Sequence, residues 1–108
     1  MFCTLMIDTA IPCGLIITEL LSNALKYAFP NQQQGEITLQ FHQRAENLVL
    51  RFSDNGVELP TDFDLEESES LGLQLVVGLT EQLNGHLELI KTPGTTFVIT
   101  LTNPHFHH

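Results

Sequence analysis

Three polar side chains recur at helical spacing near the start of the chain, within an otherwise apolar segment. Glu19 and Asn23 are four residues apart, and Lys26 follows three residues later. In a helix, side chains three and four apart stack along one line. An acid, an amide and an ammonium in a row can hold a hard cation and a phosphate together, because magnesium takes oxygen ligands from one or two protein groups and from substrate phosphates. The alternative is an ordinary solvated helix stripe.

A second polar cluster, Asp54-Asn55-Gly56, follows a segment whose alternation is typical of a strand. A carboxylate at a strand end, followed by a glycine that permits close approach of backbone and ligand, suits a pocket for a base. Asp54 can accept a hydrogen bond from the exocyclic amine of adenine, whereas guanine presents a carbonyl there. The alternative is a plain turn, in which Asp, Asn and Gly are common.

Two helices are expected to position these clusters. The first is predicted to run from Pro12, in its first turn, to about Ala28, before Pro30 ends it. Its apolar face consists of Ile17, Leu20, Leu21, Ala24, Leu25 and Ala28. The second is predicted from Leu71 to Leu83, where an Asn-Gly pair follows.

Alternating segments predict two hairpins. Residues 37–41 and 48–52 form the first around a polar turn at 43–47, and residues 87–90 and 97–101 form the second. Residues 4–7 would add a short strand, and residues 54–69 a loop. The order predicts an α+β fold, a two-layer α/β sandwich with a mixed, mostly antiparallel sheet and helices on one face. One domain would span residues 1–103, with a C-terminal tail at 104–108 that carries three of the five histidines.

Composition excludes several classes of protein. With 43% hydrophobic and 16% charged residues the chain is not of the disordered type. A formal charge of −9 argues against nucleic-acid binding, and no apolar run is long enough for membrane insertion. Cys3 and Cys13 sit in apolar surroundings without a Cys-x-x-Cys pair, which indicates free thiols and a cytoplasmic location.

Four motifs then occur in a characteristic order. They are Glu19-Leu-Leu-Ser-Asn-Ala-Leu-Lys-Tyr27, Asp54-Asn-Gly56, Ser70-Leu-Gly-Leu-Gln-Leu-Val76 and Gly94-Thr-Thr-Phe97. Together they resemble the ATP-binding catalytic domain of bacterial sensor histidine kinases, in the superfamily shared with gyrase-, chaperone- and mismatch-repair-type ATPases. The likeness is greatest to the subfamily with a short lid. It covers about Ile11 to Leu101 and implies the Bergerat-type ATP-binding fold.

The resemblance implies a magnesium and phosphate site on the first helix. Asn23 would coordinate Mg2+, Glu19 would support the metal or its water, and Lys26 would contact phosphate. These three residues are the expected catalytic group.

The same resemblance implies the rest of an ATP site. Asp54 would bind the adenine amine, with Gly56 allowing the backbone to approach. Free N–H groups at the start of the second helix would meet phosphates. The expected ATP-binding residues are Asn23, Lys26, Tyr27, Asp54, Gly56, Leu71, Gly72, Leu73, Thr95 and Thr96.

The implied function is phosphoryl transfer from Mg-ATP to a histidine on a separate dimerisation domain of the parent kinase, and indirectly to a response regulator. Such a phosphoacceptor helix is not expected in this sequence, so the chain would not be active alone. Two alternatives remain open. One is an ATP hydrolase with Glu19 as general base, and the other is a degenerate docking module that binds no nucleotide.

Two features depart from the family pattern. The usual loop signature is Asp-x-Gly-x-Gly, and Glu58 stands at the second glycine. Seven acids and no Lys or Arg lie between Asp54 and Glu69. Acids close to a triphosphate would repel ATP unless magnesium intervenes, so both features predict weakened ATP affinity. The alternative for the acidic loop is a mobile lid whose carboxylates face water.

Overall fold

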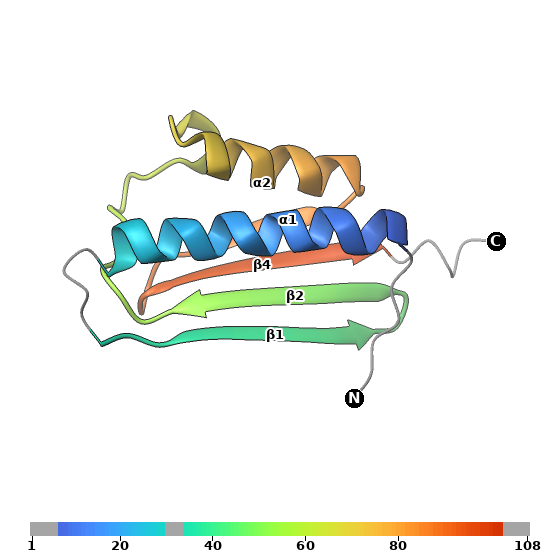
Figure 1. The fold of residues 1–108 in the computed structure, drawn as a ribbon, viewed down its shortest axis with the longest axis horizontal. Helices are drawn as coiled ribbons and strands as arrows, with labels where there is room; N and C mark the ends of the chain where they lie inside the picture. The colour runs from blue at the N-terminus through green and yellow to red at the C-terminus, as the bar shows by residue number, and fades with distance from the viewer. Residues whose placement is uncertain (1–6, 30–33, 103–108) are drawn as a thin grey trace.

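The structure is a computed structural model that describes residues 7–29 and 34–102. Helices cover one face of a four-stranded antiparallel sheet (Figure 1). The elements are α1 (Ile7–Asn23), η1 (Ala24–Ala28), β1 (Ile37–Arg44), β2 (Asn47–Asp54), η2 (Leu65–Glu67), α2 (Leu71–Gln82), β3 (His86–Ile90) and β4 (Thr95–Thr102). The expected α+β two-layer sandwich is confirmed.

The first helix begins earlier than the sequence predicted. α1 starts at Ile7, so Pro12 lies inside the helix and not in its first turn. Proline has no N–H for the carbonyl four residues earlier, which removes one helical hydrogen bond. The helix continues through it because Thr9, Cys13 and Ile16 are buried at helical spacing on both sides of the proline. The expected strand at residues 4–7 is wrong at Ile7, and its other residues lie outside the described part of the chain.

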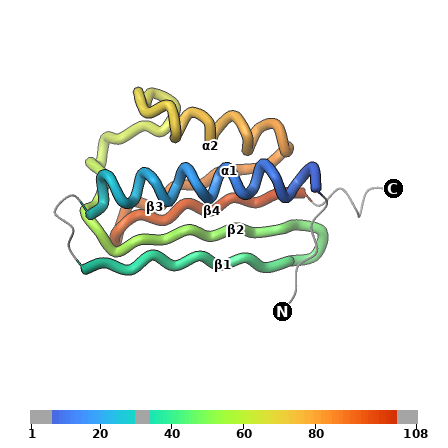
Figure 2. Tube along the Cα trace, in the orientation of Figure 1, coloured from blue at the N-terminus to red at the C-terminus, as the bar shows by residue number. Residues whose placement is uncertain are grey.

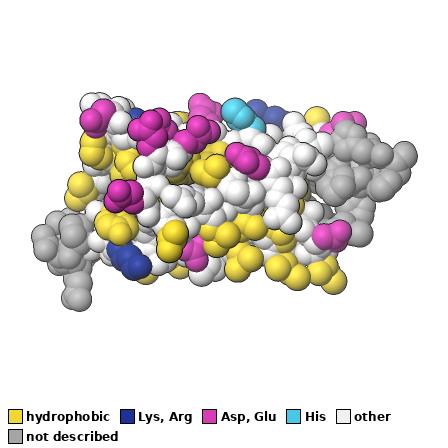
Figure 3. All heavy atoms as spheres, turned by 90° about the horizontal axis from the view of Figure 1, so that it is seen from above, with side chains coloured by type: hydrophobic (Ala, Val, Ile, Leu, Met, Phe, Trp, Pro, Cys, Tyr) yellow, Lys and Arg dark blue, Asp and Glu magenta, His cyan; other side chains and the backbone are white. Residues whose placement is uncertain are grey.

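The apolar face of α1 is narrower than expected. The buried line of α1 passes through Cys13, Ile16 and Leu20 and continues to Ala24 of η1, whereas Leu21 and Leu25 are 40% and 60% exposed. Each of these two leucines follows a buried residue and is therefore rotated by about 100° away from the sheet. In Figure 3, hydrophobic side chains form a row along one edge of the molecule. The exposed large hydrophobic residues of α1 and η1 are Ile7, Ile11, Leu15, Leu21, Leu25 and Tyr27.

Both predicted hairpins are present, and the sheet order is β1-β2-β4-β3 (Figure 2). Every strand pair among the described residues is antiparallel. Phe52 of β2 lies opposite Phe97 of β4, which places two aromatic rings on neighbouring central strands. Two residues further along the same two strands, Asp54 lies opposite Thr95. The register therefore brings a carboxylate and a hydroxyl to the same end of the sheet.

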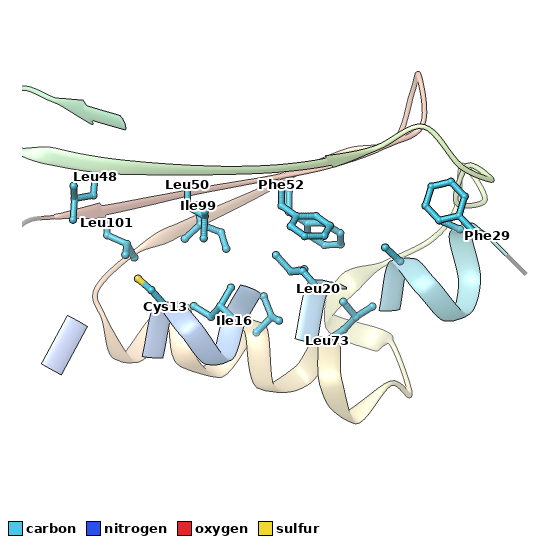
Figure 4. Packing of buried hydrophobic residues seen from close by; sticks show 14 residues of the cluster. Cys13, Ile16, Leu20, Phe29, Leu48, Leu50, Phe52, Leu73, Ile99 and Leu101 are labelled. Atoms are coloured by element: carbon cyan, nitrogen blue, oxygen red, sulfur yellow. The ribbon is translucent and has the colours of Figure 1, made fainter. Parts of the chain in front are cut away.

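The core lies between the two layers. Figure 4 shows Ile16 of α1 directed toward Leu50 and Ile99 of the sheet, and Leu20 directed toward Phe52. Ile16 and Ile99 are both 0% exposed. Fully burying an aliphatic side chain of this size stabilises the fold by roughly 1.5–3 kcal/mol. This packing fixes the polar end of α1 relative to the ends of β2 and β4. No helix in residues 7–29 and 34–102 has the length and apolarity that a bilayer span requires.

Candidate functional site

A cavity of about 550 Å³ opens at the end of the sheet where β2 ends and β4 begins. Asn23 and Tyr27 line it from α1 and η1, and Asp54 and Thr95 line it from the sheet. The other lining residues are Leu20, Ala24, Ala28, Phe52, Val57, Glu58, Leu59, Pro60, Phe63, Ser68, Glu69, Ser70, Leu73 and Phe97. The cavity thus has a mostly apolar wall with a few polar groups, which is typical of a small-molecule site.

Asn23 connects α1 to the start of α2. Its amide nitrogen donates to the carbonyl of Glu19 at 3.0 Å, and its amide oxygen accepts from the hydroxyl of Ser70 at 3.5 Å. The same Ser70 oxygen accepts the backbone N–H of Leu73 at 3.2 Å, so Ser70 is the N-cap of α2. The amide oxygen of Asn23 consequently lies at the N-terminus of a second helix.

Glycine at position 72 allows α2 to approach α1 closely. A Cβ on Gly72 would lie 2.6 Å from Oε1 of Glu19 and 3.1 Å from Nδ2 of Asn23. The structure therefore brings Glu19, Asn23 and Gly72 together. The two leucines that flank Gly72 differ in exposure: Leu71 is 81% exposed, whereas Leu73 is buried. A metal bound here would take oxygen from Asn23, with Glu19 beside it, and its remaining ligands from phosphate and water. Within the described residues, no group of three or more His, Cys, Asp or Glu side chains could hold a metal.

Asp54 is nearly buried, with 9% of its surface exposed. Its Oδ1 accepts the backbone N–H of Gly56 at 2.9 Å. Burial raises the pKa of Asp54, and the hydrogen bond from Gly56 partly offsets that rise. Its Oδ2 accepts no hydrogen bond from the described residues, which leaves an acceptor for a ligand.

The close contact of Gly56 is with η1. A Cβ at this position would overlap the carbonyl oxygen of Ala28, and the next residue, Val57, donates its N–H to that same oxygen at 2.9 Å. The sequence had related this glycine to the approach of a ligand. In the structure, its small size lets the loop after β2 pack against η1.

Other expected site residues fall in different places. Tyr27 lines the cavity, but Lys26 is exposed and does not line it. The reason is that a π-helical turn begins at Ala24, so the line through Glu19 and Asn23 is not continued at α-helical spacing. Thr95 lines the cavity, whereas the hydroxyl of Thr96 lies 3.1 Å from that of Ser53 on the neighbouring strand. Adjacent strand residues face opposite sides of a sheet, so only one threonine can face the cavity.

Glu58 lines the cavity, yet one of its carboxylate oxygens faces the β3–β4 turn. Oε2 accepts from the Thr92 hydroxyl and from the Gly94 N–H, each at 3.0 Å. The remaining acids of the loop between Asp54 and α2 are exposed; they are Asp62, Asp64, Glu66, Glu67 and Glu69. For all of these acids except Glu69, which also lines the cavity, this exposure agrees with the alternative in which the loop acids face water.

Sequence reasoning missed the loop residues that form one wall of the cavity. Val57, Leu59, Pro60 and Phe63 line it, although their segment has no periodicity that predicts burial. It also assigned no site role to Phe52 and Phe97, whose strand alternation predicts an inward direction. Ser70 was detectable, since a serine directly before an apolar helical pattern is a recognised N-cap signal.

Comparison with known proteins identifies the family. Residues 9–105 match the family model described as histidine kinase-, DNA gyrase B- and HSP90-like ATPase. The chain belongs to this ATPase family.

Its relatives include sensor kinases. The sensor histidine kinase PdtaS of Mycobacterium tuberculosis is 40% identical over 96 residues, which cover 85% of this chain and 19% of PdtaS. The blue-light-activated histidine kinase 2 of Erythrobacter litoralis is 29% identical over 99 residues, or 91% of this chain and 28% of that protein. The chain thus spans 19% to 28% of the length of these relatives.

A solved structure supports the same fold. The blue-light-activated histidine kinase EL346 of Erythrobacter litoralis superposes with a TM-score of 0.83 at 28% identity. The match covers 92% of this chain and 32% of that chain. The expected resemblance to the ATP-binding domain of histidine kinases is therefore confirmed.

Proposed function

We propose that the chain binds Mg-ATP in this cavity and presents the γ-phosphoryl group to a histidine on a separate domain. The observation that carries the proposal is that Asn23 and Asp54, from different layers, border one cavity. A single nucleotide can contact both groups only if the acceptor for adenine and the oxygen ligand for the metal border the same cavity.

Asp54 is the proposed adenine contact. Its Oδ1 is held by Gly56, so its Oδ2 is the acceptor for the exocyclic amine. The rings of Phe52 and Phe97 and the hydroxyl of Thr95 complete this end of the cavity. A buried acceptor of this kind rejects guanine, whose carbonyl would face the carboxylate.

The proposed phosphate end lies between α1 and α2. Asn23 and Glu19 would hold magnesium, and the first-turn N–H groups of α2, at Leu71 and Gly72, would meet phosphate oxygens. Lys26 is exposed and precedes Tyr27, which lines the cavity, and its ammonium group would contact the outer phosphate. When bound, magnesium supplies positive charge to the phosphates. Phosphoryl transfer requires mainly positioning and charge neutralisation from the protein.

The acceptor histidine is proposed to lie on another domain of a longer protein. PdtaS is a sensor histidine kinase of which the chain matches only 19%, and this supports a parent protein with further domains. A dimerisation domain of that parent would carry the histidine, and a response regulator would receive the phosphoryl group from it. We place this reaction in the cytoplasm, where ATP is available and where a thiol such as that of Cys13 stays reduced.

Titration with Mg-ATP, followed by NMR, tests the binding step. The backbone or side-chain amide signals of Asn23, Asp54 and Gly56 are expected to shift together along one saturable curve, and Mg-GTP should produce a much weaker response. Gln40, exposed on β1, provides an internal reference that should not move. The absence of saturable shifts at millimolar Mg-ATP would contradict the proposal and favour a docking module of the same fold.

A further inference from the structure

The wall of the cavity that sequence reasoning missed is tied to the turn between β3 and β4. Glu58 of the wall accepts from the Thr92 hydroxyl and the Gly94 N–H of the turn, at 3.0 Å each. In the opposite direction, Nζ of Lys91 in the turn donates to the carbonyls of Thr61 at 2.9 Å and Phe63 at 2.6 Å. We call these four hydrogen bonds, between residues 58–63 and residues 91–94, the clasp.

Each bond of the clasp has one charged partner. Hydrogen bonds with an ionised donor or acceptor are shorter and stronger than neutral ones. The loop from Asp54 to Glu69 has no Lys or Arg of its own, so Lys91 supplies a cation that the loop lacks. Lys91 is only partly exposed, which reduces the competition from water for its ammonium group.

The clasp attaches a loop without regular structure to the sheet. Glu58, Leu59, Pro60 and Phe63 line the cavity, and Thr95, which also lines it, directly follows the turn. β4 pairs with β2 on one side and β3 on the other, so the turn leads into an interior strand. The wall formed by residues 58–63 is thereby held at a defined position relative to Asp54.

We propose that Lys91 and Glu58 are positioning residues that hold this wall in its binding conformation before a ligand enters. A preformed wall avoids the entropy cost of ordering a loop during binding, and the affinity is higher for that reason. The ligand in this proposal, an adenine nucleotide, rests on the proposed function. The proposal also explains Glu58, because its carboxylate makes contacts that a glycine at this position could not make.

Two pairs of variants test the clasp by calorimetry. Lys91→Met removes the donor of two hydrogen bonds, whereas Lys91→Arg keeps a cation that can donate. Glu58→Ala removes the acceptor of the other two hydrogen bonds, whereas Glu58→Gln keeps an oxygen that can accept both. Lys91→Met and Glu58→Ala are expected to raise the Kd of ATP and of uncharged adenosine about fivefold or more. Lys91→Arg and Glu58→Gln should keep most of the wild-type affinity for both ligands. Arg51→Met, which removes an exposed cation on β2, is the charge control and should leave the Kd unchanged.

The two ligands separate positioning from charge attraction. If Lys91→Met weakens the binding of ATP but not that of adenosine, Lys91 acts only through its charge and the proposal is wrong. If Glu58→Gln binds the two ligands as weakly as Glu58→Ala does, the two hydrogen bonds accepted by Glu58 do not position the wall. That result would also overturn the proposal.

Amide hydrogen exchange on the ligand-free protein supplies a test that needs no nucleotide. In Lys91→Met, the amides of Phe63 and Gly94 are expected to exchange at least about tenfold faster, while those of β2 keep their protection. Unchanged exchange at Phe63 and Gly94 would overturn the clasp. Faster exchange together with a wild type that binds no adenine nucleotide would support the clasp and contradict the proposed function.

Discussion

The hydroxyl of Ser70 points at the amide oxygen of Asn23 from 3.5 Å, across 47 residues of sequence. Ser70 is the N-cap of α2, so the oxygen proposed as a metal ligand is held beside a helix N-terminus. Metal bound to Asn23 and a phosphate bound to the first turn of α2 would therefore be neighbours. This single contact relates the proposed metal and phosphate positions.

Asn23→Ala is expected to lower the affinity for Mg-ATP by at least about tenfold, or about 1.4 kcal/mol. The variant loses the proposed metal ligand, while alanine is a good helix former, so the fold should persist. Calorimetric titration measures the affinity, and circular dichroism checks the fold. Gln40→Ala removes an exposed amide on β1 and serves as the control. Equal affinities of wild type and Asn23→Ala would exclude Asn23 from the metal site.

Gly72→Ala and Gly78→Ala form a matched pair on α2. Nothing lies within 4 Å of a Cβ at Gly78, so this substitution should stabilise the protein by up to about 1 kcal/mol. A Cβ at Gly72 would meet Oε1 of Glu19 at 2.6 Å, so the Glu19 side chain must move. We expect Gly72→Ala to stabilise less and to weaken Mg-ATP binding, whereas Gly78→Ala leaves binding unchanged. Urea unfolding and calorimetry give both quantities, and identical behaviour of the two variants would contradict the close approach of α2 to Glu19.

Asp54→Asn is expected to change base preference. The amide oxygen of the variant can keep the bond from Gly56, which turns the amide NH2 toward the ligand. ATP would then face donor against donor, and its affinity should fall about tenfold or more. Inosine triphosphate presents a carbonyl at the same ring position, so the substitution should lower its affinity much less. Competition titrations measure the ratio of the two affinities, and a ratio equal to that of the wild type would exclude Asp54 as the base contact.

Asp54 should also affect the pH dependence of stability. Burial raises its pKa in the folded state above the usual value of 3.8. For a carboxyl with a raised pKa, the stabilising contribution is complete below the unfolded pKa and is lost as the pH rises through the folded pKa. At neutral pH the ionised Asp54 therefore destabilises the fold.

Comparison with Asp54→Asn isolates this contribution, because asparagine does not titrate. The free energy of unfolding of the variant, relative to wild type, is expected to increase as the pH rises through the raised pKa and then to level off. Urea unfolding at a series of pH values from acid to neutral measures it. A difference between the two proteins that is the same at every pH would show that Asp54 is not desolvated as the structure describes.

Local patterns in the sequence were enough to predict the features that lie within one segment. The alternation of residues 48–52 and 97–101 predicted both central strands and the inward direction of Phe52 and Phe97. The apolar period after Ser70 predicted α2, although the N-cap role of Ser70 itself was missed. The four motifs indicated the ATPase family. This was possible because each motif is a short contiguous run that can be read without knowledge of the fold.

How these segments meet depends on contacts between distant residues that form only in the folded chain. Burial of Thr9 and Cys13 carries α1 past Pro12, which local propensity alone would place at a helix start. The π-helical turn at Ala24 moves Lys26 out of line with Asn23. The partners of Glu58 are Thr92 and Gly94, more than thirty residues away, so its role could not be read from the loop in which it stands. Hydrophobic periodicity records which face of an element is buried, but it contains no information about which distant side chain will complete a hydrogen bond, and the site depends on such pairs.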